Sequence, residues 1–494
     1  MAAATSPCSR AGHDVQLPHV AIFPFMARGH TVPMTHLACL LRRRGLATVT
    51  FFTTPGNAPF VRRELDDDVA VVELPFPEYV VPDAAECVEA LDSLFSLPEF
   101  VEAVSVLRPR LEASLAAARP RVGLLVADAF LHWAHASAAA LGVPTVAFFG
   151  VNMFSTVMRD VILRDNPAAV LMADGGGGGE AATFSVPEFP HVHLTLADIP
   201  VPFNHPSPEG PIVEFNAKLG KAIADSKGLI VNTLHAMEGH YVEHWNRHHR
   251  VGPKAWPVGP LCLALPQPRS PCHGPGTGAA KPSWLQWLDE KAAAGRAVLY
   301  VALGTAMAIP DAQLREVADG LEAAGVDFLW AVRPSDADLG AGFEERVEGR
   351  GMVVREWVDQ WRILQHGCVK GFLSHCGWNS AVESVSAGVP LAAWPMGAEQ
   401  PINAMLVVDE LRVGVRVPAT AGHGLVGSEV IAHAAREMMM MMMMMAGEEK
   451  GGAGGEVVRN VATLAAKARE AVAEGGSSWK ALKEMITTLC RPAE

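Results

Sequence analysis

The chain has 494 residues, half of them hydrophobic, and a formal net charge of −13. This length exceeds what one hydrophobic core usually holds, so we expect two domains or more. The acidic balance argues against a broad nucleic-acid-binding surface. It does not exclude an anionic small molecule, because a helix N-terminus can hold phosphate without help from the overall charge.

The cysteine usage and the N-terminus indicate a cytoplasmic protein. Eight cysteines are scattered along the chain without a CxxC pair, which suits a reducing compartment better than a disulfide framework. Residues 1–18 contain no apolar segment of the kind found in signal peptides. A short transit peptide is the weaker alternative to the flexible tail that we expect there, since Asp14 comes early and Arg10 is the only basic residue. Residues 136–158 are uncharged, but Gly142 and Pro144 divide them, which favours helix, turn and buried strand over an integral membrane segment.

The first half of the chain alternates apolar strands with amphipathic helices. Strands are predicted at 19–25, 48–54, 122–128 and 145–149, with a helix at 31–44 closed by Gly45 and another that runs through 141. All-apolar strands separated by helices are typical of a doubly wound parallel sheet.

The second half repeats this pattern. Strands are predicted at 297–303, 327–332, 351–354, 370–374, 390–395 and 413–417, with a helix near 311–324. Residues 258–282 are rich in Pro and Gly and form a predicted linker. We therefore expect α/β architecture with two Rossmann-like domains, 19–257 and 283–476, that face each other across a cleft. The segment 477–494 is expected to be a helix that packs back on the first domain.

Two polar residues follow strands of the first predicted sheet. His30 comes shortly after the first strand, and Asp128 ends the strand at 122–128. Ligands of such sheets bind beyond the carboxyl ends of the strands. A His–Asp pair makes a general base, because the aspartate fixes the imidazole tautomer and stabilises the cation. Each residue alone could instead serve a helix start, and spacing does not prove that they meet.

The turn "SHCGWNS" lies between a buried strand and a helix predicted at 379–387. Ser380 and Glu383 have the spacing of a capping box. The same helix start, with His375 and Asn379 beside it, could bind an anion, and Glu383 could accept hydrogen bonds from a ribose. His375 and Cys376 could suggest a metal, but adjacent side chains point apart and no second pair supports zinc.

Residues 357–400, "WVDQWRILQHGCVKGFLSHCGWNSAVESVSAGVPLAAWPMGAEQ", resemble the signature box of the plant family 1 UDP-glycosyltransferases over its full length. The segments "FPFMARGHT", "TTPGN", "VADAF" and "YVALGT" also resemble this family, and the overall sequence pattern is most similar to its family 90 branch. The resemblance implies the two-domain architecture called GT-B. It also implies UDP-glucose as the donor, because glutamine in the last place of the box, here Gln400, usually accompanies that sugar.

The resemblance assigns a role to each matching position. His30 becomes the general base and Asp128 its partner. The other positions would bind the donor: Trp357, Val358, Gln360 and Glu383 at the base and ribose; Thr305, His375, Gly377, Asn379 and Ser380 at the diphosphate; Trp378, Glu399 and Gln400 at the sugar. The chain departs from the family at Asp359, where proline is commoner, and at Thr305, where serine is common.

The expected reaction is an inverting transfer of a hexose to a hydroxyl of a small hydrophobic acceptor, such as a phenolic, flavonoid, terpenoid or hormone. Apolar and aromatic segments that include Phe25, residues 149–154 and the loops near 80–100 and 190–205 would line the acceptor site. The donor and the acceptor are the expected partners, with neither nucleic acid nor a metal cofactor, and the protein is expected to be a monomer.

Three other functions compete with this one. A metal-dependent transferase would use Asp336–Ala337–Asp338, although a polar loop often carries such carboxylates. A dinucleotide-dependent oxidoreductase would use "GHGLVG" at 422–427, but the acidic residue expected beyond it does not end a strand. The third alternative is a UDP-sugar-binding protein with little or no catalytic turnover.

The chain also contains two low-complexity segments. Gly175–Gly179 is interpreted as a loop, and Met438–Met445 as a partly exposed continuation of a helix.

Overall fold

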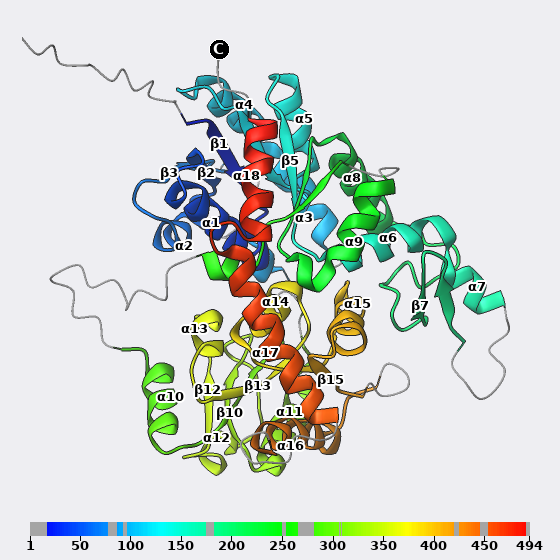
Figure 1. Ribbon diagram of the computed structural model, residues 1–494. Coiled ribbons are helices and arrows are strands. Elements are labelled where there is room, and N and C mark those ends of the chain that lie inside the picture. The colour runs from blue at the N-terminus through cyan, green and yellow to red at the C-terminus, as the bar shows by residue number, and fades with distance from the viewer. Residues whose placement is uncertain are drawn as a thin grey trace, which may run out of the picture.

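A computed structural model describes residues 17–77, 86–91, 96–173, 182–248, 253–264, 281–305, 307, 309–418, 424–444 and 453–490. Figure 1 shows two lobes, the N-terminal one above and the C-terminal one below, with α17 (Ala453–Val472) and α18 (Ser477–Leu489) crossing between them. Each lobe is built on a parallel sheet with helices packed around it. The predicted fold class, two Rossmann-like α/β domains, is confirmed.

The N-terminal sheet has seven parallel strands in the order β3-β2-β1-β4-β5-β8-β9. Every residue of the central strands β1, β4 and β5 is buried, because helices cover both faces of the sheet. Their bounds are β1 His19–Phe23, β2 Thr48–Thr53, β3 Ala70–Glu73, β4 Leu124–Asp128, β5 Thr145–Phe149, β8 Leu229–Val231 and β9 Ala255–Pro257. A separate antiparallel pair joins β6 (Phe184–Val186) to β7 (Phe189–Leu194).

The helices of this lobe connect successive strands. They are α1 Arg28–Arg43, α2 Ala58–Glu64, α3 Leu97–Val104, α4 Arg108–Ala117, α5 His132–Ala140, α6 Met153–Asp165, α7 Pro167–Ala173, α8 Pro211–Asp225 and α9 His235–His248, with 3-10 turns at Val88–Ala90, Ser105–Leu107 and Leu261–Ala264. Because α1 begins earlier than predicted, His30 lies in its first turn rather than before it. Residues 136–158 form helix, turn and strand as predicted, and no helix among the described residues is long and apolar enough to cross a membrane.

The C-terminal sheet has six parallel strands in the order β12-β11-β10-β13-β14-β15, and all six were predicted. They are β10 Val298–Ala302, β11 Asp327–Ala331, β12 Gly351–Val354, β13 Val369–Ser374, β14 Leu391–Ala393 and β15 Gly414–Arg416. The helices are α10 Ser283–Ala293, α11 Asp311–Ala324, α12 Phe343–Arg346, α13 Gln360–Leu364, α14 Trp378–Ala387, α15 Gln400–Met405 and α16 Ser428–Met444, with a π-helical turn at Leu406–Glu410.

The methionine run belongs to α16, and Met445 lies outside the described residues. Met438 is fully buried over Gly371 of β13, where an added Cβ would lie 2.5 Å from the Met438 side chain. Met440 is 56% exposed. The run therefore packs into the core on one side of α16 and is exposed to solvent on the other.

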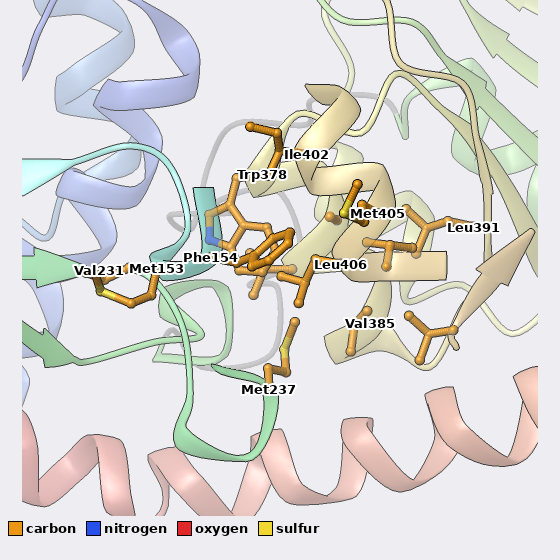
Figure 2. Close-up of a cluster of buried hydrophobic side chains, with 14 of the residues drawn as sticks. Met153, Phe154, Val231, Met237, Trp378, Val385, Leu391, Ile402, Met405 and Leu406 are labelled. Carbon is orange, nitrogen blue, oxygen red and sulfur yellow. The ribbon is translucent and has the colours of Figure 1, made fainter. Parts of the chain in front are cut away.

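A hydrophobic cluster joins the two lobes (Figure 2). Met153, Phe154 and Met237 of the N-terminal lobe belong to the same buried cluster as Trp378 and Leu406 of the C-terminal lobe. Apolar side chains from both lobes exclude water at this junction, so the lobes share one core cluster in addition to the clusters that each has of its own.

The predicted linker and the C-terminal segment both contact the N-terminal lobe. Leu261 is buried in the same cluster as α1, so the start of the 258–282 segment is packed, while 265–280 lies outside the described residues, as do 1–16 and Gly175–Gly179. Leu482, Met485 and Ile486 of α18 are buried in that cluster as well. The chain thus returns to its first domain at its end.

We predict that Leu482→Ala lowers the free energy of unfolding of the N-terminal lobe by about 2–5 kcal/mol, because it removes a fully buried leucine and leaves a cavity. Chemical denaturation followed by tryptophan fluorescence would measure the change. Thr488→Ala, at an exposed position of the same helix, should shift the transition little. Equal shifts for the two variants would contradict the packing of α18 described above.

Candidate active site

His30 and Asp128 meet at the carboxyl edge of the N-terminal sheet. Strands β1 and β4 are parallel neighbours, so the residues that follow β1 lie beside the end of β4. The Nδ1 atom of His30 lies 2.7 Å from Oδ2 of Asp128. The other carboxylate oxygen of Asp128 accepts the backbone N–H of Phe130 at 3.0 Å, which fixes the carboxylate toward the imidazole.

The environment of His30 favours proton uptake. Asp128 is fully buried, whereas the His30 side chain keeps 18% of its surface exposed. Burial by itself would lower the pKa of His30, but the carboxylates of Asp128, Glu399 and Glu89 outweigh it and raise the pKa above its ordinary value. Because Nδ1 donates to Asp128, Nε2 is the atom that can accept a proton.

Close packing holds the imidazole of His30 in place. The rings of Phe25 and Phe130 lie 5.6 Å and 4.8 Å from it, centroid to centroid. An added Cβ at Gly150 would lie 3.1 Å from Cε1 of His30, so only glycine fits there without displacing the ring. Further aromatic contacts extend this apolar surface to Phe100, Phe149 and Phe215.

The turn between β13 and α14 holds a partly buried histidine, His375. Cβ atoms added at Gly304 and Gly377 would lie 2.8 Å and 2.5 Å from Nε2 of His375, so two glycines make room for the ring. Burial lowers the pKa of His375 to about 4, and the backbone of Ala302 beside the ring opposes that shift. Cys376, next to it, has φ +64° and is fully buried.

The predicted capping box at Ser380 and Glu383 is wrong. The helix begins at Trp378 with Gly377 as its N-cap, which places Ser380 inside the first turn, where it cannot cap. Both side chains instead accept hydrogen bonds from Nε2 of Gln360, at 3.0 Å for Ser380 Oγ and 2.8 Å for Glu383 Oε2. Burial raises the pKa of Glu383 to about 7.

Trp357 is available for stacking. It is 44% exposed, unlike most large apolar side chains of the protein. Phe60 of the N-terminal lobe meets it edge-on at 6.2 Å, and the guanidinium carbons of Arg28 and Arg333 lie 5.7 Å and 5.8 Å from its ring centroid. Trp357, the residue predicted to stack on the base, therefore lies where the two lobes approach each other. The two guanidinium groups beside it, of Arg28 and Arg333, come from outside the signature box.

Val358 and Thr305 are predicted donor-binding positions, and Asp359 is a position where the chain departs from the family. Val358 is buried, so its backbone rather than its side chain is suited to a base contact. Asp359, which replaces a commoner proline, caps α13 by accepting the backbone N–H of Arg362 at 3.0 Å. Thr305 is partly exposed beyond the end of β10.

The side chains of Trp378 and Asn379 are engaged by the N-terminal lobe. The indole N–H of Trp378 donates to the carbonyl of Asn232 at 2.8 Å, and Trp378 is 2% exposed. Asn379 Oδ1 accepts from Asn232 Nδ2 at 3.2 Å, and Asn379 Nδ2 donates to the carbonyl of Gly29. The turn after β13 is thereby tied directly to the residue that precedes His30.

Glu399 and Gln400 begin α15. Gln400 Oε1 accepts the backbone N–H groups of Met396 and Gly397 at 2.9 Å and 3.1 Å, so its amide is oriented by the turn before it. Burial raises the pKa of Glu399, whose charge in turn favours protonation of His30. Asn403 donates to Glu399 at 3.3 Å.

Sequence reasoning missed the asparagines at this junction: Asn152, Asn232 and Asn403. Asn152 does carry a signal, since an Asn after a buried strand with Ser155 at the right spacing is typical of an N-cap. Asn403 follows the signature box by one helical turn and has no such pattern.

The metal and dinucleotide hypotheses gain no support from the described residues. Asp338 accepts from the side chain of Arg315 and from the backbone N–H of Gly340, so part of its carboxylate is already used. No group of three or more His, Cys, Asp or Glu side chains in the described ranges could hold a metal ion. Residues 419–423, which include the start of the "GHGLVG" segment, lie outside the described residues.

Known proteins resemble this chain over almost its whole length. Residues 277–422 match the family described as UDP-glucoronosyl and UDP-glucosyl transferase. The chain is 39% identical to UDP-glycosyltransferase 90A1 of Arabidopsis thaliana over 96% of each chain. It is 33% identical to UDP-glucose flavonoid 3-O-glucosyltransferase 7 of Fragaria ananassa, over 95% of this chain and 96% of that protein.

Two solved structures share the fold. The complex of Glycyrrhiza uralensis UGT73P12 with glycyrrhetinic acid 3-O-monoglucuronide superposes with a TM-score of 0.80 at 29% identity, covering 96% of each chain. The complex of Arabidopsis thaliana UGT89C1 with UDP-L-rhamnose gives a TM-score of 0.70 at 29% identity, covering 97% of this chain and 100% of that one.

Two facing Rossmann-like domains of this kind define a glycosyltransferase of the GT-B architecture. The chain belongs to the plant family 1 UDP-glycosyltransferases. The resemblance inferred from the signature box is confirmed, and so is the likeness to the family 90 branch, from which UDP-glycosyltransferases 90A1 and 90A2 come.

We predict that the His30 imidazole titrates above 6.5, its ordinary value, because nearby carboxylates favour its protonated form. Asp128→Asn should lower that pKa, since the amide carries no charge. NMR titration of the ring protons would measure both values. A wild-type pKa at or below 6.5, or a pKa unchanged in Asp128→Asn, would contradict the electrostatic account of this pair.

Proposed function

We propose that this enzyme transfers glucose from UDP-glucose to a hydroxyl of a small hydrophobic acceptor, with inversion at the anomeric carbon. The observation that carries the proposal is the 2.7 Å contact between His30 and Asp128, on the edge of the sheet that faces the turn after β13. The family supplies the reaction class, and this contact supplies a base where an acceptor hydroxyl can approach.

His30 acts as the general base in this mechanism. Its Nε2 atom takes the proton of the acceptor hydroxyl while the oxygen attacks the anomeric carbon and the bond to UDP breaks. Asp128 holds the tautomer and stabilises the imidazolium that forms, which is why its burial and its second hydrogen bond matter. As a base must be unprotonated, the rate should fall as the pH drops through the pKa of His30.

The donor is held mainly by dipoles and neutral groups. The backbone N–H groups at the start of α14, with Asn379, Ser380, Thr305 and the neutral His375, would receive the diphosphate. These groups act most strongly when UDP departs, because the diphosphate then gains charge.

The base, ribose and sugar contacts follow the family pattern with two adjustments. Trp357 would stack on the uracil, and Val358 would contact it through its backbone. The ribose hydroxyls would compete with Gln360 for the carboxylate of Glu383, because the two side chains are hydrogen-bonded in the free protein. Since the Trp378 indole is committed to Asn232, sugar contacts would come from the Trp378 backbone and from Glu399 and Gln400.

The acceptor is expected to be apolar around its hydroxyl. Phe25 and Phe130 contact the ring of His30. Phe100, Phe149 and Phe215 extend the same aromatic surface. Relatives named for flavonoid and scopoletin glucosylation agree with a phenolic acceptor. Terpenoid or hormone alcohols fit the same surface. The proposal includes a monomeric, metal-independent enzyme in the cytoplasm, the location that the scattered free cysteines favour.

Mass spectrometry on purified protein tests the proposal. With UDP-glucose and a panel of phenolic and terpenoid alcohols, we predict a gain of one hexose that excess EDTA does not change. His30→Ala should lower the rate by a factor on the order of 10² to 10⁴, the usual contribution of a general base. UDP binding should survive in that variant, because His30 lies in the other lobe from the donor-binding turn.

Other outcomes would contradict separate parts of the proposal. Loss of transfer in EDTA would show a metal requirement, and transfer only to highly polar acceptors would exclude the apolar acceptor site. Full activity in His30→Ala would remove the base. UDP-glucose binding without transfer or slow hydrolysis would favour a binding protein.

A further inference from the structure

One fully buried side chain links the donor turn to the acceptor lobe. Asn403 of α15 is 0% exposed, and its amide makes hydrogen bonds in both directions. Its Oδ1 atom accepts from Asn152 Nδ2 at 2.8 Å and from Ser155 Oγ at 2.7 Å. Its Nδ2 atom donates to the carbonyl of Cys376 at 2.9 Å and to Glu399 Oε1 at 3.3 Å.

The donor end of this set of contacts is a strained part of the backbone. Cys376 has φ +64°, a conformation that few residues other than glycine adopt. It lies between His375 and Gly377, so its carbonyl direction sets how the following N–H groups at the start of α14 point. The hydrogen bond from Asn403 therefore helps to hold the proposed diphosphate-binding turn in this shape.

The acceptor end is the start of α6. Asn152 caps this helix by accepting the backbone N–H of Ser155 at 2.5 Å, and it also donates to Asn403. The chain reaches Asn152 directly from Gly150, which packs against the His30 imidazole. A shift at the start of α6 would thus move Gly150 and change its packing against the imidazole of His30.

The contact with Glu399 adds a third connection. Glu399 is a proposed sugar-binding residue, and its charge also acts on His30. Asn403 fixes one oxygen of that carboxylate, while the apolar junction beside it, which includes Ile402 and Met405 of α15, excludes water (Figure 2).

We propose that Asn403 is a positioning residue. It fixes the donor-binding turn, Glu399 and the start of α6 in their positions relative to His30. This inference rests on the proposed function and extends it to a residue outside the signature box. Only an amide of this length offers two acceptor and two donor positions at once. A carboxylate would present an oxygen to the Cys376 carbonyl and to Glu399, and an alkyl side chain would leave all four partners unsatisfied.

Steady-state kinetics of Asn403→Ala, Asn152→Ala and the double variant test the proposal. We expect Asn403→Ala to lower kcat/KM by a factor on the order of 10 to 100, because small misplacements of reacting groups are costly. KM for UDP-glucose should rise as kcat falls, whereas a loss of folded protein would lower kcat alone. The double variant should be less impaired than the product of the two single effects, because the two side chains share one hydrogen bond. Asn152→Ala also removes the cap of α6, so the double variant should still be worse than Asn403→Ala by the cost of that cap.

Asn460→Ala is the matched control. It makes the same substitution as Asn403→Ala, but it removes only an exposed hydrogen bond, from Asn460 Nδ2 to the carbonyl of Arg412 at 3.2 Å, outside this set of contacts. It should stay within about twofold of the wild type. The proposal is overturned if Asn403→Ala behaves like this control, or if the effects of Asn403→Ala and Asn152→Ala multiply independently.

Two further measurements keep the outcome decisive. If Asn403→Ala does not fold, Ser155→Ala removes one hydrogen bond while leaving the helix in place, and it should lower kcat/KM where Asn460→Ala does not. Calorimetric titration with UDP separates this inference from the proposed function. If the wild type binds UDP but transfers no sugar, the proposed function fails, and weaker UDP binding in Asn403→Ala still supports the positioning role, whereas unchanged binding overturns it.

Discussion

The hydrogen bonds between the turn after β13 and the carboxyl edge of the N-terminal sheet are the constraint on which the rest of the site depends. Asn379 contacts Gly29, Trp378 contacts Asn232, and Asn403 contacts Asn152. Neither sheet alone contains both a base and a donor site. The Trp378–Asn232 and Asn403–Asn152 contacts are buried beside an apolar junction, so these polar groups must find their partners in the opposite lobe, which defines the relative position of the lobes. The Asn379–Gly29 contact lies at the exposed margin of the same junction.

The charges of the site are divided between the lobes. His30 stands among carboxylates, which favour a proton on it, while burial keeps His375 neutral at the proposed diphosphate site. This arrangement suits a reaction in which a proton moves to His30 in the N-terminal lobe while negative charge develops at the proposed diphosphate site in the C-terminal lobe. The cations near Trp357, Arg28 and Arg333, come from outside the signature box and stand at the proposed uracil site rather than the diphosphate site.

Much of the fold could be predicted from the sequence because the strands are apolar runs between clear helix signals, as in β5 and β11. Short or exposed strands such as β3 and β8 have no such contrast and were missed. The signature box implied which positions would bind the donor, and these stay proposals. Local spacing suggested a capping box at Ser380 and Glu383, but the N-cap of the helix is Gly377. The sequence could not show that Asn403 meets Asn152, because that contact joins residues 251 positions apart and depends on how the lobes dock.

The configuration of the product tests the central claim most directly. If His30 activates the acceptor for direct attack, the acceptor oxygen must reach the anomeric carbon from the face opposite to the departing UDP, and the configuration inverts. UDP-glucose carries an α-linked sugar, so NMR of the isolated glucoside should show a β linkage. An α-linked product would mean retention of configuration and would contradict the mechanism in which His30 and Asp128 activate the acceptor for direct attack.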